Sequence, residues 1–62
     1  MFEPKNLIGM THDDAKMLAG SYGFIVRTAS VNNHPMMMTD DIIETRINVN
    51  INDNIVTSFF VG

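Results

Sequence analysis

The chain has no cysteine, and at 62 residues it can fold around only one apolar core. Without cysteine, a disulfide framework, a thiol nucleophile and a Cys-ligated zinc or iron–sulfur site are excluded. Hydrophobic residues make up 45% of the chain and charged residues 18%, which is the composition of a folded domain. We therefore expect a single domain over residues 1–62. A core of this size supplies about 3–5 kcal/mol of stability.

The charge pattern argues against two classes of partner. The net charge is −3, and the four basic residues are scattered along the chain: Lys5, Lys16, Arg27 and Arg46. A nucleic-acid partner needs a clustered basic patch, and no apolar run approaches the ~20 residues of a membrane span. Neither nucleic acid nor a membrane is therefore an expected partner. The N-terminus lacks the basic-then-apolar pattern of a signal peptide, so a complete chain would be expected in the cytoplasm.

The first regular element that the sequence predicts is a helix from Thr11 to Ser21. Thr11 can cap its start, and Asp13 and Asp14 fall in the first turn, where carboxylates interact favourably with the helix dipole. Apolar positions then repeat with the helical period, which places them on one face of the helix. They are Ala15, Leu18, Ala19 and Tyr22. Residues 1–10 before this helix are predicted to form an irregular arm that lies on the core.

Three strands are predicted after the helix. Residues 24–31 are rich in β-branched and aromatic side chains, which favours a strand. Residues 46–51 alternate strictly, so that three aliphatic side chains face one side and three polar side chains face the other. Residues 52–54 form a turn into a last strand over residues 55–61. Residues 32–41 show no period and include Pro35, which has no backbone donor, so a long loop is predicted there.

This order of elements predicts an α+β fold, with a single helix packed on a small mixed β-sheet. A long crossover between the first two strands implies that they are parallel, with a long protruding loop between them. The last two strands, joined by a short turn, are expected to be antiparallel. The residues expected in the core are Leu7, Ile8, Ala15, Leu18, Val26, Ile47, Val49 and Ile51.

Four short motifs stand out along the chain. The segment Leu7–Lys16 reads LIGMTHDDAK, residues 39–42 read TDDI, residues 46–51 read RINVNI, and residues 61–62 read VG. The first motif resembles the opening L-V/I-G-x-S/T-x-E/D-E/D-A-K of the potato inhibitor I family. The later motifs resemble its T-x-D loop, its R-V/L-R/N-V strand and its terminal V-G. The resemblance covers nearly the whole chain and is strongest to the shorter bacterial and fungal members of the family.

The resemblance implies a small serine-protease inhibitor that is not itself an enzyme. Its extended loop, about residues 35–42, would enter a protease active site as a substrate does. An arginine suits the support of such a loop because its fork of donors reaches several oxygens at once, and Arg46 lies on the strand face opposite the core. We therefore expect Arg46 to contact the loop backbone or the carboxylate of Asp41. Asn48, on the same face, is a second candidate support. The reactive-site loop residues are Met36, Met37, Met38, Thr39, Asp40, Asp41 and Ile42.

The position of the cleaved bond depends on which family arginine matches Arg46. If Arg46 matches the first, Asp40 is the specificity residue and the bond is Asp40–Asp41. If it matches the second, the bond is Met38–Thr39. The first register is preferred because it keeps the Thr and Asp of the loop in place. An aspartate suits an acid-preferring protease, whereas a methionine suits the apolar pocket of a subtilisin- or chymotrypsin-like enzyme.

The same residues have other interpretations. Arg46 could instead pair with Glu44 on a solvated sheet face, and Asn48 could be only an outward polar position. The side chains of the Met36–Met38 run could fold back into the core, bury in a homo-oligomer, or grip a partner, because methionine is adaptable. The alternative function is therefore a non-inhibitory protein-interaction module on the same scaffold, possibly oligomeric, with this loop as its contact surface.

No pattern in the sequence predicts a metal, a cofactor or an enzyme. His12 and His34 are far apart and, even with the acidic pair Asp13–Asp14, show no metal-ligand spacing. Asp40 and Asp41 are adjacent in a predicted loop, where neighbouring side chains point apart, so they are not an acid/base pair. No motif places a histidine beside a hydroxyl nucleophile. The hydroxyl residues in question are Ser21, Ser30, Ser58 and the threonines.

Overall fold

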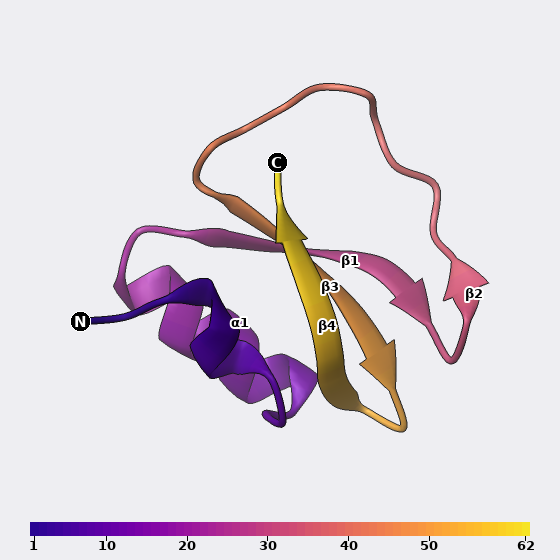
Figure 1. The fold of residues 1–62 in the computed structure, drawn as a ribbon, viewed down its shortest axis with the longest axis horizontal. Coiled ribbons are helices and arrows are strands. Elements are labelled where there is room, and N and C mark those ends of the chain that lie inside the picture. Colours follow the sequence, from indigo (N-terminus) through magenta and orange to yellow (C-terminus); the bar gives the residue numbers. More distant parts are fainter.

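Two parallel strands form the centre of the sheet, and the rest of the chain is arranged around them (Figure 1). The computed structural model describes residues 1–62. The four-stranded sheet has the order β2-β1-β3-β4, in which β1 and β3 are parallel and the other two pairs are antiparallel. The predicted α+β class, with one α-helix on a small mixed sheet, is confirmed. The elements are η1 (Pro4–Leu7), α1 (His12–Ser21), β1 (Ile25–Val31), β2 (His34–Pro35), β3 (Arg46–Asn52) and β4 (Ile55–Val61).

Helix α1 begins and ends where local sequence signals place it. The hydroxyl oxygen of Thr11 accepts a hydrogen bond from the backbone N–H of Asp14 at 3.2 Å, which caps the first turn. After Ser21 the chain turns at Gly23, whose φ of 83° lies in the left-handed region that glycine adopts without strain. The backbone N–H of Phe24 then donates to the carbonyl of Ala19 and directs the chain into β1. The predicted helix is confirmed, with Thr11 as its cap.

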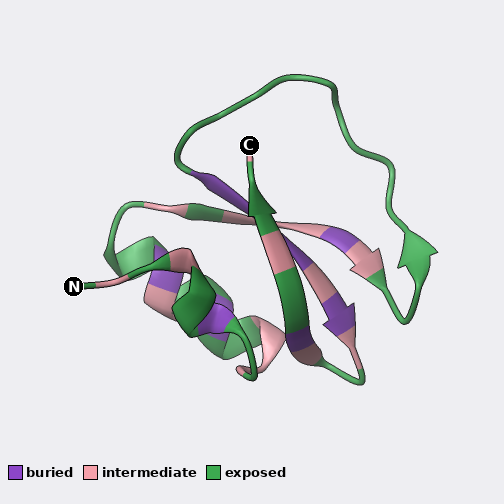
Figure 2. Cartoon of the chain, viewed as in Figure 1, coloured by how far each residue is buried: buried purple, intermediate pink, exposed green.

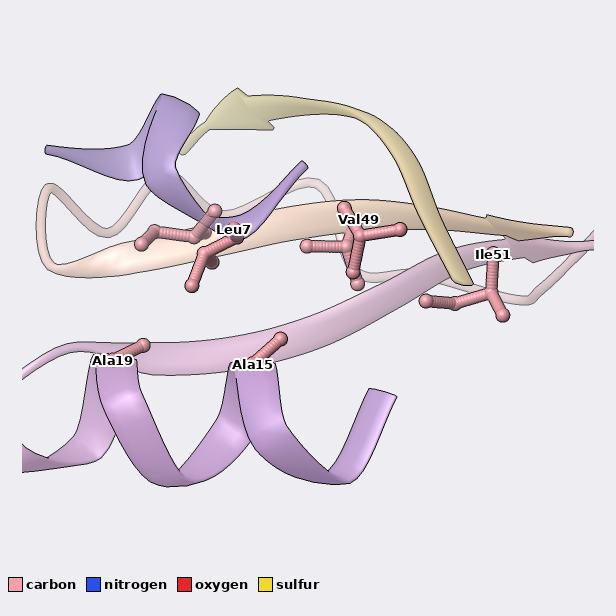
Figure 3. Close-up of a cluster of buried hydrophobic side chains, with 7 residues drawn as sticks. Leu7, Ala15, Ala19, Val49 and Ile51 are labelled. Carbon is pink, nitrogen blue, oxygen red and sulfur yellow. The ribbon is translucent and has the colours of Figure 1, made fainter. Parts of the chain in front are cut away.

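The core lies between α1, η1 and the central strand β3 (Figure 3). Ala15 and Ala19 point from α1 toward the sheet, where their small side chains let the helix approach closely. Figure 2 shows that burial is concentrated on β3. Most of the predicted core is confirmed, and Ala19 and Val56 belong to it as well. The buried core cluster contains Leu7, Ala15, Ala19, Ile47, Val49, Ile51 and Val56, and the partly buried Leu18 and Val26 pack against it.

The prediction that Ile8 is a core residue is wrong. Its side chain is 49% exposed, whereas the neighbouring Leu7 is completely buried. Leu7 is the last residue of the 3-10 helix η1, and the backbone becomes extended at Ile8, with φ −64° and ψ 129°. Only one of the two adjacent aliphatic side chains can face the core across this change of direction.

The N-terminal arm is more ordered than the sequence suggested. The backbone N–H of Glu3 donates to Asn6 Oδ1 at 2.9 Å, and Pro4 sits at the start of η1, where its missing N–H costs nothing. Phe2 stacks on Tyr22 with ring centroids 5.1 Å apart and is tilted against Phe24 at 5.5 Å. These contacts attach the arm to the C-terminal end of α1, so the prediction of an irregular arm is corrected to a short 3-10 helix.

Two hairpins have two-residue turns of the same kind. Val31 pairs with His34, and the residues between them, Asn32 and Asn33, have φ angles of 48° and 67°. In the β3–β4 hairpin, Asp53 and Asn54 have φ angles of 51° and 67°. Positive φ at both central positions defines the type I′ turn, which matches the twist of paired strands and favours Asn and Asp.

The first hairpin corrects the prediction of one long loop over residues 32–41. Residues 32–35 form the turn and the short strand β2, and the segment without helix or strand is residues 36–45. Pro35 is tolerated because β2 is an edge strand, where a missing donor breaks no ladder between strands. The backbone N–H of Met36 continues the pairing by donating to the carbonyl of Ala29 at 2.9 Å.

The turn geometry predicts a large effect on stability for one substitution of Asn54 and a small effect for another. Asn54→Val is expected to lower the free energy of unfolding by about 1–2 kcal/mol, because a β-branched residue is strained in the left-handed region. Asn54→Gly should leave the free energy of unfolding within about 0.5 kcal/mol of the native value, because glycine adopts the left-handed conformation without strain. Urea denaturation followed by circular dichroism measures both. Equal midpoints for the two variants would show that this turn is not left-handed in solution.

Candidate functional site

The candidate loop lies in the segment between β2 and β3. Every residue from 36 to 45 is exposed, and the segment forms a wide arc beside the end of β4 (Figures 1 and 2). Met37 is fully exposed, and Met36 and Met38 are about half exposed, so none of the three folds back into the core. Ile42 is largely exposed as well. The loop therefore presents apolar side chains on both sides of Asp40.

Arg46 connects this loop to the sheet. It is the first residue of β3 and is only 7% exposed. Its Nη2 donates to the backbone carbonyl of Asp41 at 2.8 Å, and its Nη1 donates to Asp41 Oδ2 at 3.3 Å. Its Nε donates to the carbonyl of Gly62 at 2.8 Å. The expected contacts of Arg46 with the loop backbone and with the Asp41 carboxylate are both present, and its ion-pair partner is Asp41 and not Glu44.

A second arginine, Arg27 on β1, also holds the loop, and none of the sequence motifs predicts this contact. Its Nη1 donates to Thr39 Oγ1 at 3.0 Å and lies 3.9 Å from Asp41 Oδ1. Arg27 is the direct partner of Asn48 in the parallel β1–β3 register, which brings it onto the same face as Arg46. The alternation of β1 combined with this register would have identified it, but the register depends on residues far apart in the chain.

Asn48 reaches the loop only through Arg27. It is completely buried, and its Oδ1 accepts a hydrogen bond from Arg27 Nε at 2.7 Å. Its Nδ2 donates to the carbonyls of Phe60 and Gly62, at 3.3 and 3.2 Å. Because buried polar groups need hydrogen-bond partners, these bonds to Phe60 and Gly62 hold the Asn48 amide in one orientation, and its Oδ1 in turn fixes the position of the Arg27 side chain. It thereby orients a residue that contacts the loop.

Thr39 and Asp41 are the loop residues that these arginines hold. The Thr39 hydroxyl donates to Asp41 Oδ1, while Thr39 Oγ1 accepts from Arg27. The hydrogen bond from Thr39, followed by the hydrogen bond from Arg46, lowers the pKa of the Asp41 carboxyl below its usual value, against a smaller effect of burial. The loop is therefore attached to the sheet through an ionised Asp41.

The lowered pKa predicts how the loop responds to acid. Because the folded state favours ionised Asp41, the stabilisation is complete above the unfolded pKa of about 3.9 and is lost as the pH falls below it. We expect the mobility of residues 39–42, measured by NMR relaxation, to rise only below about pH 4. In the Asp41→Asn variant, residues 39–42 should be mobile already at neutral pH, and their mobility should change little as the pH is lowered. An unchanged acid response in this variant would place the titrating group elsewhere.

The other sequence candidates are not brought together. His12 Nε2 lies 3.1 Å from Thr28 Oγ1 in β1, whereas His34 is in β2. No group of three His, Asp or Glu side chains is placed to hold a metal ion. Ser30 and Ser58 are hydrogen-bonded to Asn50. The only α-helix has ten residues, and no helix meets the length and hydropathy needed to cross a membrane.

The candidate site is therefore a loop that two arginines attach to the sheet, with Asn48 and Gly62 as partners of those arginines. Arg46 binds Asp41, Arg27 binds Thr39, and Asn48 orients Arg27 while Gly62 accepts from both Arg46 and Asn48. Comparisons of the chain with family models, with curated proteins and with solved structures find no match.

Proposed function

We propose that this protein is a serine-protease inhibitor whose binding loop is the segment of residues 36–42. The observation that carries the proposal is the double attachment of the loop, in which Arg27 holds Thr39 and Arg46 holds Asp41. The backbone on both sides of Asp40 is thus restrained before a partner arrives. Restraint of this kind reduces the conformational entropy that is lost on association, which is what a loop needs to bind tightly in an active site.

The attachments also supply what separates an inhibitor from a substrate. If a protease attacks the Asp40–Asp41 bond, the segment that ends at Asp40 stays tied to Arg27 through Thr39. The segment that begins at Asp41 stays tied to Arg46. The new amine of Asp41 therefore remains beside the acyl group of Asp40, where its high effective concentration favours rejoining over hydrolysis.

The geometry supports the Asp40–Asp41 bond over Met38–Thr39. The residues immediately before and after Asp40 are the two whose side chains the arginines hold. On the other assignment, the residue before the specificity position would be Met37, which is fully exposed and has no such attachment. A restrained residue on each side of the attacked bond is the more effective arrangement for holding cleaved ends together.

The proposal is tested by titrating the protein against subtilisin-like, chymotrypsin-like and glutamate-specific serine proteases of known active-site concentration. We expect stoichiometric inhibition of at least one class. Mass spectrometry of the complex should recover mostly intact chain with a minor species cut at Asp40–Asp41.

Two results would contradict the proposal. Rapid cleavage within residues 36–42 without inhibition would make the loop a substrate. Absence of both inhibition and cleavage, together with a dimer by analytical ultracentrifugation whose loop methionines are protected from oxidation, would favour the interaction module.

A further inference from the structure

The structure distinguishes the two adjacent aspartates of the loop by their partners. The Asp41 carboxylate accepts from Thr39 and Arg46 and lies 3.9 Å from Arg27. The Asp40 carboxylate takes part in none of the side-chain hydrogen bonds or ion pairs of the chain, and the residue is exposed where the backbone bends. Asp41 is thus compensated within the protein, whereas Asp40 presents an uncompensated negative charge to a partner.

An uncompensated carboxylate restricts the kind of pocket that can receive it. Transfer of Asp40 into an apolar pocket would remove its hydration and provide no counter-charge, which is strongly unfavourable. A pocket containing an arginine, a lysine or a protonated histidine would provide charge-assisted hydrogen bonds to both carboxylate oxygens. Because the two neighbours of Asp40 are held to the sheet, the loop cannot easily turn this carboxylate away from the pocket.

We infer that the target of this protein is a serine endoprotease with a cationic primary pocket, one that cleaves after acidic residues. This inference rests on the proposed function and specifies its partner. The exposed side chains of Met37 and Ile42, on either side of the bond, add apolar contacts next to the charged one. The loop therefore fits an enzyme whose primary pocket is basic and whose subsites for the residues beyond Thr39 and Asp41 are apolar.

The experiment compares inhibition constants for four forms of the chain against a glutamate-specific endopeptidase and a chymotrypsin-like enzyme. The forms are the native chain, Asp40→Asn, Asp40→Leu and the matched control Glu44→Gln, which removes one exposed negative charge just beyond the loop. The native chain should inhibit the acid-specific enzyme at least tenfold more tightly. Asp40→Asn should lose at least tenfold against that enzyme, and Asp40→Leu should gain at least tenfold against the chymotrypsin-like enzyme. Glu44→Gln should change either constant less than threefold.

Failure of this inference differs from failure of the proposed function. If the native chain inhibits the chymotrypsin-like enzyme best, both Asp40 variants behave like the native chain, and Met38→Asp abolishes inhibition, the protein is an inhibitor cleaved at Met38–Thr39. In that case the inferred target is wrong. If none of the forms inhibits either enzyme, and the native chain does not inhibit a subtilisin-like protease either, the proposed function itself is overturned.

Discussion

Leu7→Ala is expected to leave much of the chain unfolded even without denaturant. Leu7, the last residue of η1, is completely buried in the core, where it packs against the sheet (Figure 3). Truncation of a buried leucine costs about 2–5 kcal/mol, because apolar contact is lost and a cavity remains. A domain of this size has only about 3–5 kcal/mol in total. The loss should be visible as a reduced far-ultraviolet circular dichroism signal and as a strongly lowered urea midpoint.

The matched control for this prediction is Met17→Ala. Met17 is 74% exposed on α1, so its truncation should change the free energy of unfolding by less than about 0.5 kcal/mol. Similar urea midpoints for the two variants would mean that η1 does not pack on the sheet in solution. In that case the N-terminal arm would contribute little to the core.

The second large effect is expected for Arg46→Ala, which should release the loop while most of the sheet remains folded. The substitution removes donors to the Asp41 carbonyl, the Asp41 carboxylate and the Gly62 carbonyl. We expect a ten- to hundredfold loss of inhibition, equivalent to about 1.4–2.8 kcal/mol. Amide hydrogen exchange over residues 38–42 should accelerate, and the target protease should cut the loop more rapidly.

The substitution Arg46→Lys distinguishes the contribution of the positive charge from that of the guanidinium geometry. Arg46→Lys keeps the positive charge but replaces the planar fork with a single ammonium group, which cannot reach the same three acceptors in fixed directions. Its inhibition constant should lie between those of the native chain and Arg46→Ala. If the alanine variant is folded and its loop exchanges and is cut at native rates, the loop does not depend on Arg46.

The parts of the fold that were predicted correctly are those with local signals. The capping residue Thr11 and the acidic first turn of the helix lie within a few residues of each other. The alternation of residues 46–51 correctly separates Ile47 in the core from Arg46 on the opposite face. The β3–β4 turn was likewise recognised from its own residues. In each case the physical cause, a capping bond or a two-residue period, operates over less than ten residues.

The features that were missed depend on contacts between distant residues. Arg27 becomes a loop contact only because β1 and β3 pair with Arg27 opposite Asn48, 21 residues away. The sequence does not predict strand β2, because a proline usually interrupts a strand, whereas Pro35 lies in an edge strand where its missing N–H breaks no ladder. Hydropathy alone does not separate Ile8 from Leu7, so it predicts both in the core. For the site, the sequence identified Arg46 and its contact with Asp41 but not the second arginine.

Gly62 forms hydrogen bonds both to the side chains that support the loop and to the backbone of β3. Its carbonyl accepts from Arg46 and from Asn48, and its N–H donates to the carbonyl of Arg46. Opening the end of β4 would therefore displace the two side chains on which the loop attachments depend. The rigidity of the loop is thus thermodynamically linked to β3–β4 pairing, so that fluctuations far from Asp40 along β4 set how long the loop keeps its binding-competent shape.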